Sequence, residues 1–246
     1  MARGRRGGGA RVERFPGGAR LVEADVVLSE VRSAPGPTHD LFDLLAAAVV
    51  ALSPGPRLAL LGFAAGGVLA PLRGMGWEHP VEAVDLDLSG VALFRELCGD
   101  WAGEVRVDRE DALAWLARRR RRFDAILEDL SVPGIDGGTK PPVSLDGLPE
   151  LIPRRLVPGG VAVVNLLPVT GMGWGEIVAA AGSCYPARLL VEFELWENRV
   201  LLGGDALPPA REAGRRIRER LRALGSREAD RIRVRTLPPG PAAPRA

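Results

Sequence analysis

Acidic side chains follow three of the short apolar runs in this chain of 246 residues. Asp85 lies in VEAVDL, Asp111 comes shortly after EVRV, and Asp129 comes directly after FDAILE. A carboxylate accepts hydrogen bonds from hydroxyl or amino groups, and it can take a proton from an attacking nucleophile. If these runs are parallel strands, their carboxyl ends meet at one edge of a sheet, where open α/β sheets bind ligands. The spacing therefore predicts an acidic ligand site.

A glycine-rich turn precedes these acids in the sequence LLGFAAGGVLAPL. Gly62, Gly66 and Gly67 let the backbone approach a ligand closely, and the start of the following helix attracts negative or polar groups. Such turns also occur where a helix simply packs tightly on a strand, so the residue types alone favour neither interpretation. The position of the turn after the first expected strand favours a ligand site.

Asp85 ends the second expected strand, where this kind of fold places an acid that accepts hydrogen bonds from two ribose hydroxyls. The alternative is that Asp87 or Ser89 merely caps the next helix. We expect ribose binding for Asp85 and helix capping for Ser89. Asp111 can accept the amino group of adenine, and it can equally serve as an acid at a helix N-terminus, since the two roles are compatible.

Asp129 is the candidate catalytic residue, because it ends the fourth expected strand beside the expected switch point of the sheet. Its carboxylate can deprotonate an attacking amine or hold it by a charged hydrogen bond. The alternative is an exposed loop acid with no role. Three nearby acids, Glu128, Asp136 and Asp146, are further candidates.

Apolar runs alternate with helical patterns from Pro56 onward, a rhythm that is typical of a parallel sheet. The expected strands are 57–62, 81–86, 104–107, 124–128 and 160–167. The expected helices are 67–76, 89–98, 110–121, 145–156 and 173–181. Right-handed crossovers place such helices on both faces, so the pattern predicts a doubly wound sheet.

Two further strands, 187–195 and 198–204, are separated by only two residues, and so short a connection requires an antiparallel hairpin. The predicted fold class is therefore α/β and Rossmann-like, with a mostly parallel seven-stranded sheet that ends in an antiparallel hairpin. This is the arrangement of class I methyltransferases, whereas a dinucleotide dehydrogenase usually continues with another parallel unit.

The two ends of the chain differ in composition from its middle. We predict a disordered basic arm over 1–18, a small N-terminal β-hairpin appendage with a helix over 19–53, and a Rossmann-like nucleoside-binding domain over 54–207. The last segment, 208–246, is expected to be an Arg-rich helix to about residue 235 and then a Pro-rich tail. The helix is expected either to pack on the domain or to bind a partner.

The composition excludes several classes of protein. Thirty-three basic against 31 acidic residues leave a net charge of +2, so charge does not indicate a specific nucleic-acid partner. Cys98 and Cys184 have no CxxC spacing and His39 and His79 have no partner at ligand spacing, so neither a disulfide framework nor a metal site is expected. The longest apolar run, 41–52, is too short to span a membrane, and no apolar stretch follows the basic N-terminus. These features predict a cytoplasmic protein.

Six motifs together resemble the spermidine synthase family, in the order and spacing seen there. They are LLGFAAGGVLAPLR, VEAVDLD, VRVDREDALAWL, FDAILEDLSVPG, LVPGGVAVVNL and WENRVLLGG. The resemblance covers about residues 20–204, and THDLFDLLAAAV at 38–49 is faintly similar to the tyrosine-histidine-glutamate helix start of that family.

The resemblance implies aminopropyl transfer from decarboxylated S-adenosylmethionine to a small amine, without a metal, by an enzyme that self-associates as a homodimer. It implies ribose binding by Asp85, an adenine contact by Asp111 and a catalytic role for Asp129, which also contacts the nucleoside. The remaining nucleoside-binding positions that it implies are Gly62, Ala64, Gly66, Gly67, Leu86 and Ala112.

Two acids of the family are missing from this chain. Ala65 stands where the family's glycine loop carries an acid, and Val132 stands where its second strand-end acid lies. The usual tyrosine-rich lining is also absent, since Tyr185 is the single tyrosine. Cations bind poorly without paired carboxylates, so a standard putrescine site is not expected.

Three functions are compatible with these features. The first is an aminopropyltransferase with an altered acceptor site. The second is a methyltransferase that uses ordinary S-adenosylmethionine on a small acceptor, because the diamine-binding acids that most separate the two chemistries are missing. The third is a non-catalytic nucleoside-binding or interaction protein.

Overall fold

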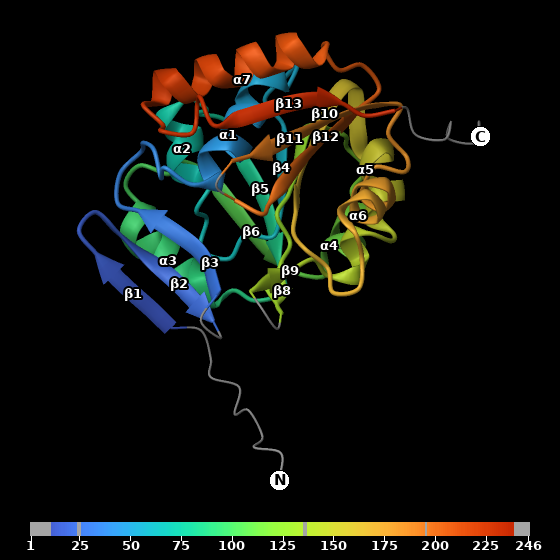
Figure 1. Ribbon diagram of the computed structural model, residues 1–246. Helices are drawn as coiled ribbons and strands as arrows, with labels where there is room; N and C mark the ends of the chain where they lie inside the picture. Colours follow the sequence, from blue (N-terminus) through green and yellow to red (C-terminus); the bar gives the residue numbers. More distant parts are fainter. Residues whose placement is uncertain (1–10, 24–25, 135–136, 195, 239–246) are drawn as a thin grey trace.

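The computed structural model describes residues 11–23, 26–134, 137–194 and 196–238. Its centre is an eight-stranded sheet with the order β13-β11-β12-β10-β7-β4-β5-β6 (Figure 1). The five parallel strands are β4 (Leu58–Leu61), β5 (Val81–Asp85), β6 (Val105–Arg109), β7 (Phe123–Glu128) and β10 (Leu156–Leu166). The hairpin strands are β11 (Ala187–Phe193) and β12 (Arg199–Gly204), and β12 pairs antiparallel with β10. The predicted α/β fold class is confirmed.

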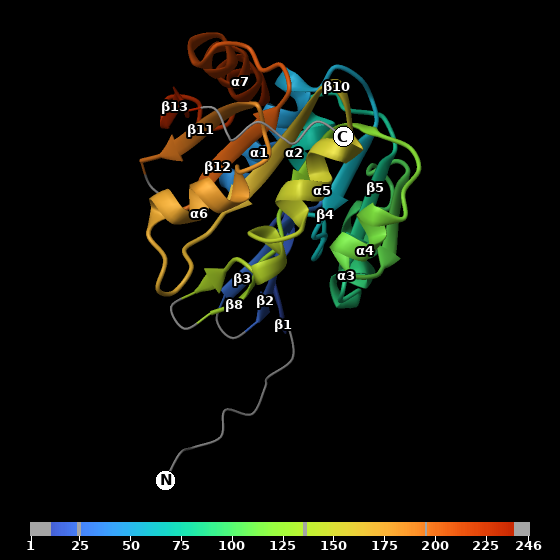
Figure 2. The ribbon, with the colours of Figure 1, turned by 90° about the vertical axis from the view of Figure 1, so that its right-hand side faces the viewer.

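Helices cover both faces of this sheet, as Figure 2 shows from the side. One hydrophobic cluster joins the sheet to α1 (Leu41–Leu52), α2 (Leu69–Gly74), α3 (Ser89–Cys98) and α7 (Ala210–Leu224). The cluster on the other face contains α4 (Ala112–Ala117), α5 (Leu148–Arg155) and α6 (Trp174–Ala181). Central strands are buried on both faces, which explains why β4 and β7 read as continuous apolar runs.

The eighth strand, β13 (Ile232–Thr236), corrects the prediction of a helix to residue 235. Helix α7 ends at Leu224 because Gly225 adopts the left-handed conformation that terminates helices. The sequence IRVRT then alternates apolar and basic residues, a strand pattern, and it pairs antiparallel with β11 at the edge of the sheet. Of the two alternatives expected for α7, the structure shows packing on the domain, since Ile217 and Leu221 are completely buried.

The N-terminal sheet has three strands rather than two: β1 (Arg11–Phe15), β2 (Gly18–Glu23) and β3 (Val26–Arg32). The predicted hairpin is the β2–β3 pair. The prediction of a disordered arm over 1–18 is wrong for residues 11–18, because β1 pairs with β2 and the Phe15 ring lies against the guanidinium groups of Arg20 and Arg32. Residues 1–10 lie outside the described residues.

The segment after β7 crosses the carboxyl end of the sheet. We call residues 130–134 and 137–144 the strap. It contains the two-stranded ribbon β8 (Val132–Pro133) with β9 (Gly138–Thr139), and a 3₁₀ turn, Pro142–Ser144. Figures 1 and 2 both place the strap at the end of the molecule where the N-terminal sheet lies, with α7 at the opposite end. Within the described ranges, no helix has the length and apolar character of a membrane span.

Candidate nucleoside and acceptor site

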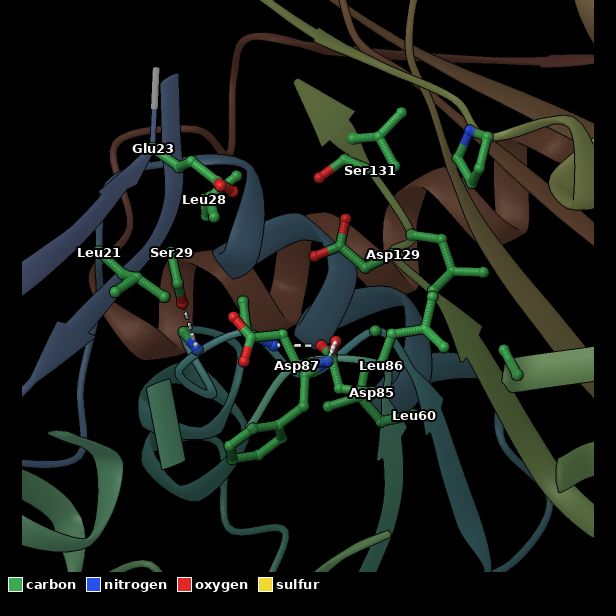
Figure 3. Close-up of a pocket in the computed structure, with 18 of the residues that line it drawn as sticks. Leu21, Glu23, Leu28, Ser29, Leu60, Asp85, Leu86, Asp87, Asp129 and Ser131 are labelled. Carbon is green, nitrogen blue, oxygen red and sulfur yellow. Dashed lines mark hydrogen bonds between the residues drawn. The ribbon is translucent and has the colours of Figure 1, made fainter. Parts of the chain in front are cut away.

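A cavity of about 260 Å³ opens at the carboxyl ends of β4, β5 and β7, between the N-terminal sheet and the strap (Figure 3). Eight of the nine predicted binding residues line it. They are Gly62, Ala64, Gly67, Asp85, Leu86, Asp111, Ala112 and Asp129. Gly66 is not in the wall and instead shapes the turn beneath it, packed against the rings of Phe63 and Phe94. The predicted residues therefore come together in one site.

Asp85 holds the glycine-rich turn in place. Its Oδ2 accepts hydrogen bonds from the backbone N–H groups of Phe63 and Ala64, both at 2.7 Å, and its Oδ1 accepts one from Asp87 at 3.0 Å. Ala64 has a positive φ of 47°, a backbone conformation that few non-glycine residues adopt, and these bonds help to hold it there. An ionised carboxylate accepts about four hydrogen bonds, so Asp85 retains capacity for a ligand hydroxyl.

The Asp87 carboxylate, and not the Ser89 hydroxyl, is the acceptor that stabilises the start of α3. The backbone N–H and the hydroxyl of Ser89 both donate to the Asp87 carboxylate, at 2.9 and 2.6 Å. These hydrogen bonds hold the pKa of Asp87 below its usual value. The expectation that Ser89 itself caps the helix is therefore wrong, because its side chain serves as a donor to the preceding acid.

Asp111 caps α4, in agreement with the helix N-terminal role predicted for it. Its side chain accepts a hydrogen bond from Ala114 N at 3.0 Å, which satisfies a backbone donor that the helix itself leaves free. The residue is exposed and also lines the cavity, so capping leaves a second carboxylate oxygen available.

Asp129 extends the hydrogen-bond register of β7 by one residue, since its N–H donates to Leu61 O on β4 at 2.8 Å. Its Oδ1 accepts a hydrogen bond from Asn165 Nδ2 at 2.7 Å, and Asn165 Oδ1 in turn accepts one from Asn198 Nδ2 at 3.0 Å. Burial raises the pKa of Asp129 to about 6, although the Asn165 hydrogen bond and the charge of Lys140 act to lower it. A carboxylate with a pKa close to neutrality is a better base than an ordinary aspartate.

Glu128, the neighbouring acid, has a different environment. Its Oε1 accepts hydrogen bonds from Lys140 Nζ at 2.7 Å, Leu130 N at 2.8 Å and Ser144 Oγ at 3.2 Å. The side chains of Glu128 and Lys140 are 1% and 0% exposed, so this is a buried ion pair. Glu128 therefore anchors the strap and does not face the cavity.

The two remaining acids considered beside Asp129 do not contribute to this site as the structure describes it. Asp146 does not line the cavity, and Asp136 lies outside the described residues. Asp129 is therefore the strand-end acid that reaches the ligand side of the sheet from β7.

The N-terminal sheet contributes a wall that was not predicted from the sequence. Leu21, Glu23, Leu28 and Ser29 all line the cavity. The Ser29 hydroxyl accepts a hydrogen bond from Gly67 N at 3.0 Å, which docks β3 onto the start of the glycine-turn helix. The alternation in GARLVE and VVLSE predicts strands, but it does not indicate which of their residues reach the cavity, and the adjacent residues Leu28 and Ser29 both line it.

The cavity is strongly acidic. The carboxylates that line it belong to Glu23, Asp85, Asp87, Glu110, Asp111 and Asp129. None of the described residues in the wall is a lysine, arginine or histidine. Among the described residues, no group of three side chains is arranged to hold a metal ion. The arrangement suits a cationic organic ligand with hydroxyl groups, because the carboxylates can accept its hydrogen bonds and offset its charge.

Neither a family model nor a curated protein matches the chain in sequence. Solved structures do match it in fold. A spermidine synthase in complex with the transition state analogue AdoDATO is 14% identical over 85% of this chain and 75% of its own, with a TM-score of 0.65. The spermidine synthase from Thermotoga maritima is 13% identical over 91% and 78%, with a TM-score of 0.64. Human methyltransferase-like protein 13 in complex with SAH is 19% identical over 76% and 92%, with a TM-score of 0.59. The chain therefore has the fold that spermidine synthases share with class I methyltransferases.

Proposed function

We propose that this protein is a transferase that binds an S-adenosylmethionine-type nucleoside and moves the aminopropyl group of its decarboxylated form to an amine. The half of the cavity around Asp85, Asp87 and Asp111 would hold the nucleoside. Asp85 would accept hydrogen bonds from the ribose hydroxyls, and Asp111 would accept one from the adenine amino group. The glycine turn lets the backbone approach the ligand.

In the proposed reaction, the lone pair of the acceptor nitrogen attacks the methylene carbon next to the sulfonium. The carbon–sulfur bond breaks, its electrons return to sulfur, and neutral methylthioadenosine leaves. The nitrogen loses one proton, which Asp129 accepts. The protein's tasks are to orient the two reactants and to receive that proton.

The observation that carries this proposal is the environment of Asp129. Its carboxylate lies at the edge of the nucleoside half of the cavity, oriented by Asn165 and with its pKa raised to about 6 by burial. A carboxylate beside Asn165 at this position can bind an ammonium group and then take its proton. A structural acid would instead resemble Glu128, whose Oε1 accepts hydrogen bonds from three donors and which does not line the cavity.

The acidic wall favours the decarboxylated nucleoside over ordinary S-adenosylmethionine. Both ligands carry a sulfonium and an ammonium group, but only ordinary S-adenosylmethionine adds a carboxylate. That carboxylate would meet no basic side chain among the described wall residues and would be repelled by six acids. Decarboxylation removes the repelled group and raises the net positive charge of the ligand.

Methyl transfer is the second candidate, favoured by the two positions where the spermidine synthase acids are replaced. Ala65 is buried without contact with the cavity and Val132 presents a branched apolar side chain to it. A methyltransferase needs no acid there, since its transferred group carries no amine.

Calorimetric titration with S-adenosylmethionine, its decarboxylated form and methylthioadenosine tests the proposal, followed by assays of methylthioadenosine release with an amine panel. We expect the decarboxylated form to bind most tightly. Asp129→Asn should keep nucleoside binding and slow transfer by about 100-fold or more, the usual worth of a general base. Tighter binding of the carboxylated form, together with transfer of a labelled methyl group, would favour the second candidate. Failure of all three compounds to bind would refute both.

A further inference from the structure

The part of the cavity wall that the N-terminal sheet and the strap contribute, which we call the apolar half, is largely apolar. The N-terminal sheet contributes Leu21 and Leu28, and the strap contributes Val132 and Val143 with its prolines. Figure 3 shows Leu21 and Leu28 on one side of the cavity and Asp129 with Ser131 on the other. Val132 is 40% exposed although it is apolar, so part of its hydrocarbon surface remains available to a ligand.

Among the described residues, the charged side chains that the N-terminal sheet, the strap and the adjoining end of β7 bring to the wall are Glu23 and Asp129. Asp129 serves the reacting nitrogen in the proposed function. The Glu23 carboxylate makes no hydrogen bond or ion pair with a described residue, so it can pair with the ammonium of the aminopropyl chain. These two carboxylates then pair with two cations, and the described residues of the N-terminal sheet and the strap contribute no further carboxylate for a third.

A diamine acceptor would bring that third cation. Its distal ammonium would have to leave water for a wall of leucine, valine and proline, which is costly for a charge without a partner. A hydrocarbon or aromatic body at the same place would instead gain from its removal from water.

We propose that the acceptor is a primary monoamine with a hydrocarbon or aromatic body. Its nitrogen lies at Asp129, and its body lies between the leucines of the N-terminal sheet and the valines of the strap. This inference rests on the proposed function, and it names the class of acceptor that the second half of the site takes.

The sharpest test compares butylamine with 1,4-diaminobutane, which share a four-carbon chain and differ in one ammonium group. Calorimetry with the methylthioadenosine-saturated Glu23→Gln variant measures their binding without requiring transfer. The substitution is needed because methylthioadenosine lacks the aminopropyl ammonium and would leave the Glu23 carboxylate free for the second ammonium of 1,4-diaminobutane. We expect butylamine to bind at least about tenfold more tightly, hexylamine more tightly still, and phenethylamine comparably to hexylamine. Equal or tighter binding of 1,4-diaminobutane would overturn the inference and leave the proposed transfer chemistry standing.

A variant at the strap gives an independent readout. Val132→Asp adds a carboxylate to the apolar wall and should shift the ratio of the two affinities toward 1,4-diaminobutane by about tenfold or more. Val132→Ala removes similar hydrocarbon without adding charge and should weaken hexylamine while leaving that ratio unchanged. An unchanged ratio in Val132→Asp would count against the apolar half as the acceptor site. If amines bind as expected and none releases methylthioadenosine from the decarboxylated nucleoside, the proposed transfer fails and the binding preference stands.

Discussion

The two halves of the cavity are built by different means. In the nucleoside half, short carboxylates end successive strands and are held by backbone N–H groups, as Asp85 is by Phe63 and Ala64. In the acceptor half, apolar side chains come from the N-terminal sheet and the strap, two segments outside the parallel core. In the proposed function, recognition of the nucleoside would therefore depend on the parallel sheet itself, whereas recognition of the acceptor would depend on the N-terminal sheet and the strap at its edge.

This difference determines which half of the cavity can change in sequence without disturbing the fold. The nucleoside half follows from the β–turn–α geometry, so it cannot change without disturbing the core of the fold. The contacts that attach the acceptor half include the Glu128–Lys140 pair and the Ser29–Gly67 hydrogen bond. Each of the following changes affects one half, or the carboxylate between them.

Lys140→Met should have the largest effect, because it leaves the buried Glu128 carboxylate without its partner cation. Breaking a buried ion pair by removing one partner costs about 3–5 kcal/mol. We expect a loss of that size in the free energy of unfolding, measured by urea denaturation. At temperatures where the variant stays folded, its loosened strap should weaken amine binding much more than nucleoside binding.

The double variant Glu128→Gln/Lys140→Met is the matched control. It removes both charges and should recover most of the lost stability, since the penalty comes mainly from the uncompensated carboxylate. If the double variant is as unstable as the single one, packing of the lysine stem, and not the ion pair, anchors the strap.

Asp85→Ala should disable the nucleoside half. The change removes the acceptor for two loop N–H groups as well as the proposed ribose contact, and hydrogen bonds to a charged group contribute about 1.5–3 kcal/mol each. We expect methylthioadenosine to bind at least about 100-fold more weakly by calorimetry. Asp87→Ala removes the Ser89 contacts at the start of α3 and one wall carboxylate but keeps the acceptor for the loop N–H groups, so it should weaken binding less than about tenfold. Similar losses in both variants would contradict a distinct role for Asp85.

The same contrast explains which parts of the molecule could be predicted from sequence. The parallel core and its acids were predictable because buried strands such as β4 and β7 read as uninterrupted apolar runs, and each strand end marks its ligand side. The capping by Asp111 was foreseen for the same reason, since a polar residue before a helical pattern is a local signal.

The acceptor half was not predictable, because its residues meet only through tertiary docking. Glu23 and Leu28 enter the cavity after the N-terminal sheet packs on the glycine turn, and no local pattern records that contact. The strand β1 was missed because RVERF is short and follows a glycine-rich stretch of low complexity. The strand β13 was missed because the helical pattern of α7 was extended past Gly225.

Asp129→Asn should change the free energy of unfolding least. Whether the change stabilises or destabilises the fold tests the role of the carboxylate between the two halves. Burial raises the pKa of Asp129 from an ordinary 3.8 to about 6, so between these values the folded state binds more protons than the unfolded chain. The free energy of unfolding therefore falls as the pH rises through this window, and above it the ionised, buried carboxylate destabilises the fold. Asparagine still accepts the Asn165 hydrogen bond and carries no charge. We expect the variant to be more stable than the wild type at pH 8 by on the order of 2 kcal/mol, and equal to it below pH 3.

Urea denaturation across this range measures the difference, and Asp111→Asn at the exposed helix cap should show no such gain. A variant that is less stable than the wild type at pH 8 would mean that Asn165 and Lys140 outweigh burial, in which case Asp129 is a structural acid like Glu128 and the two halves of the cavity do not meet at a base.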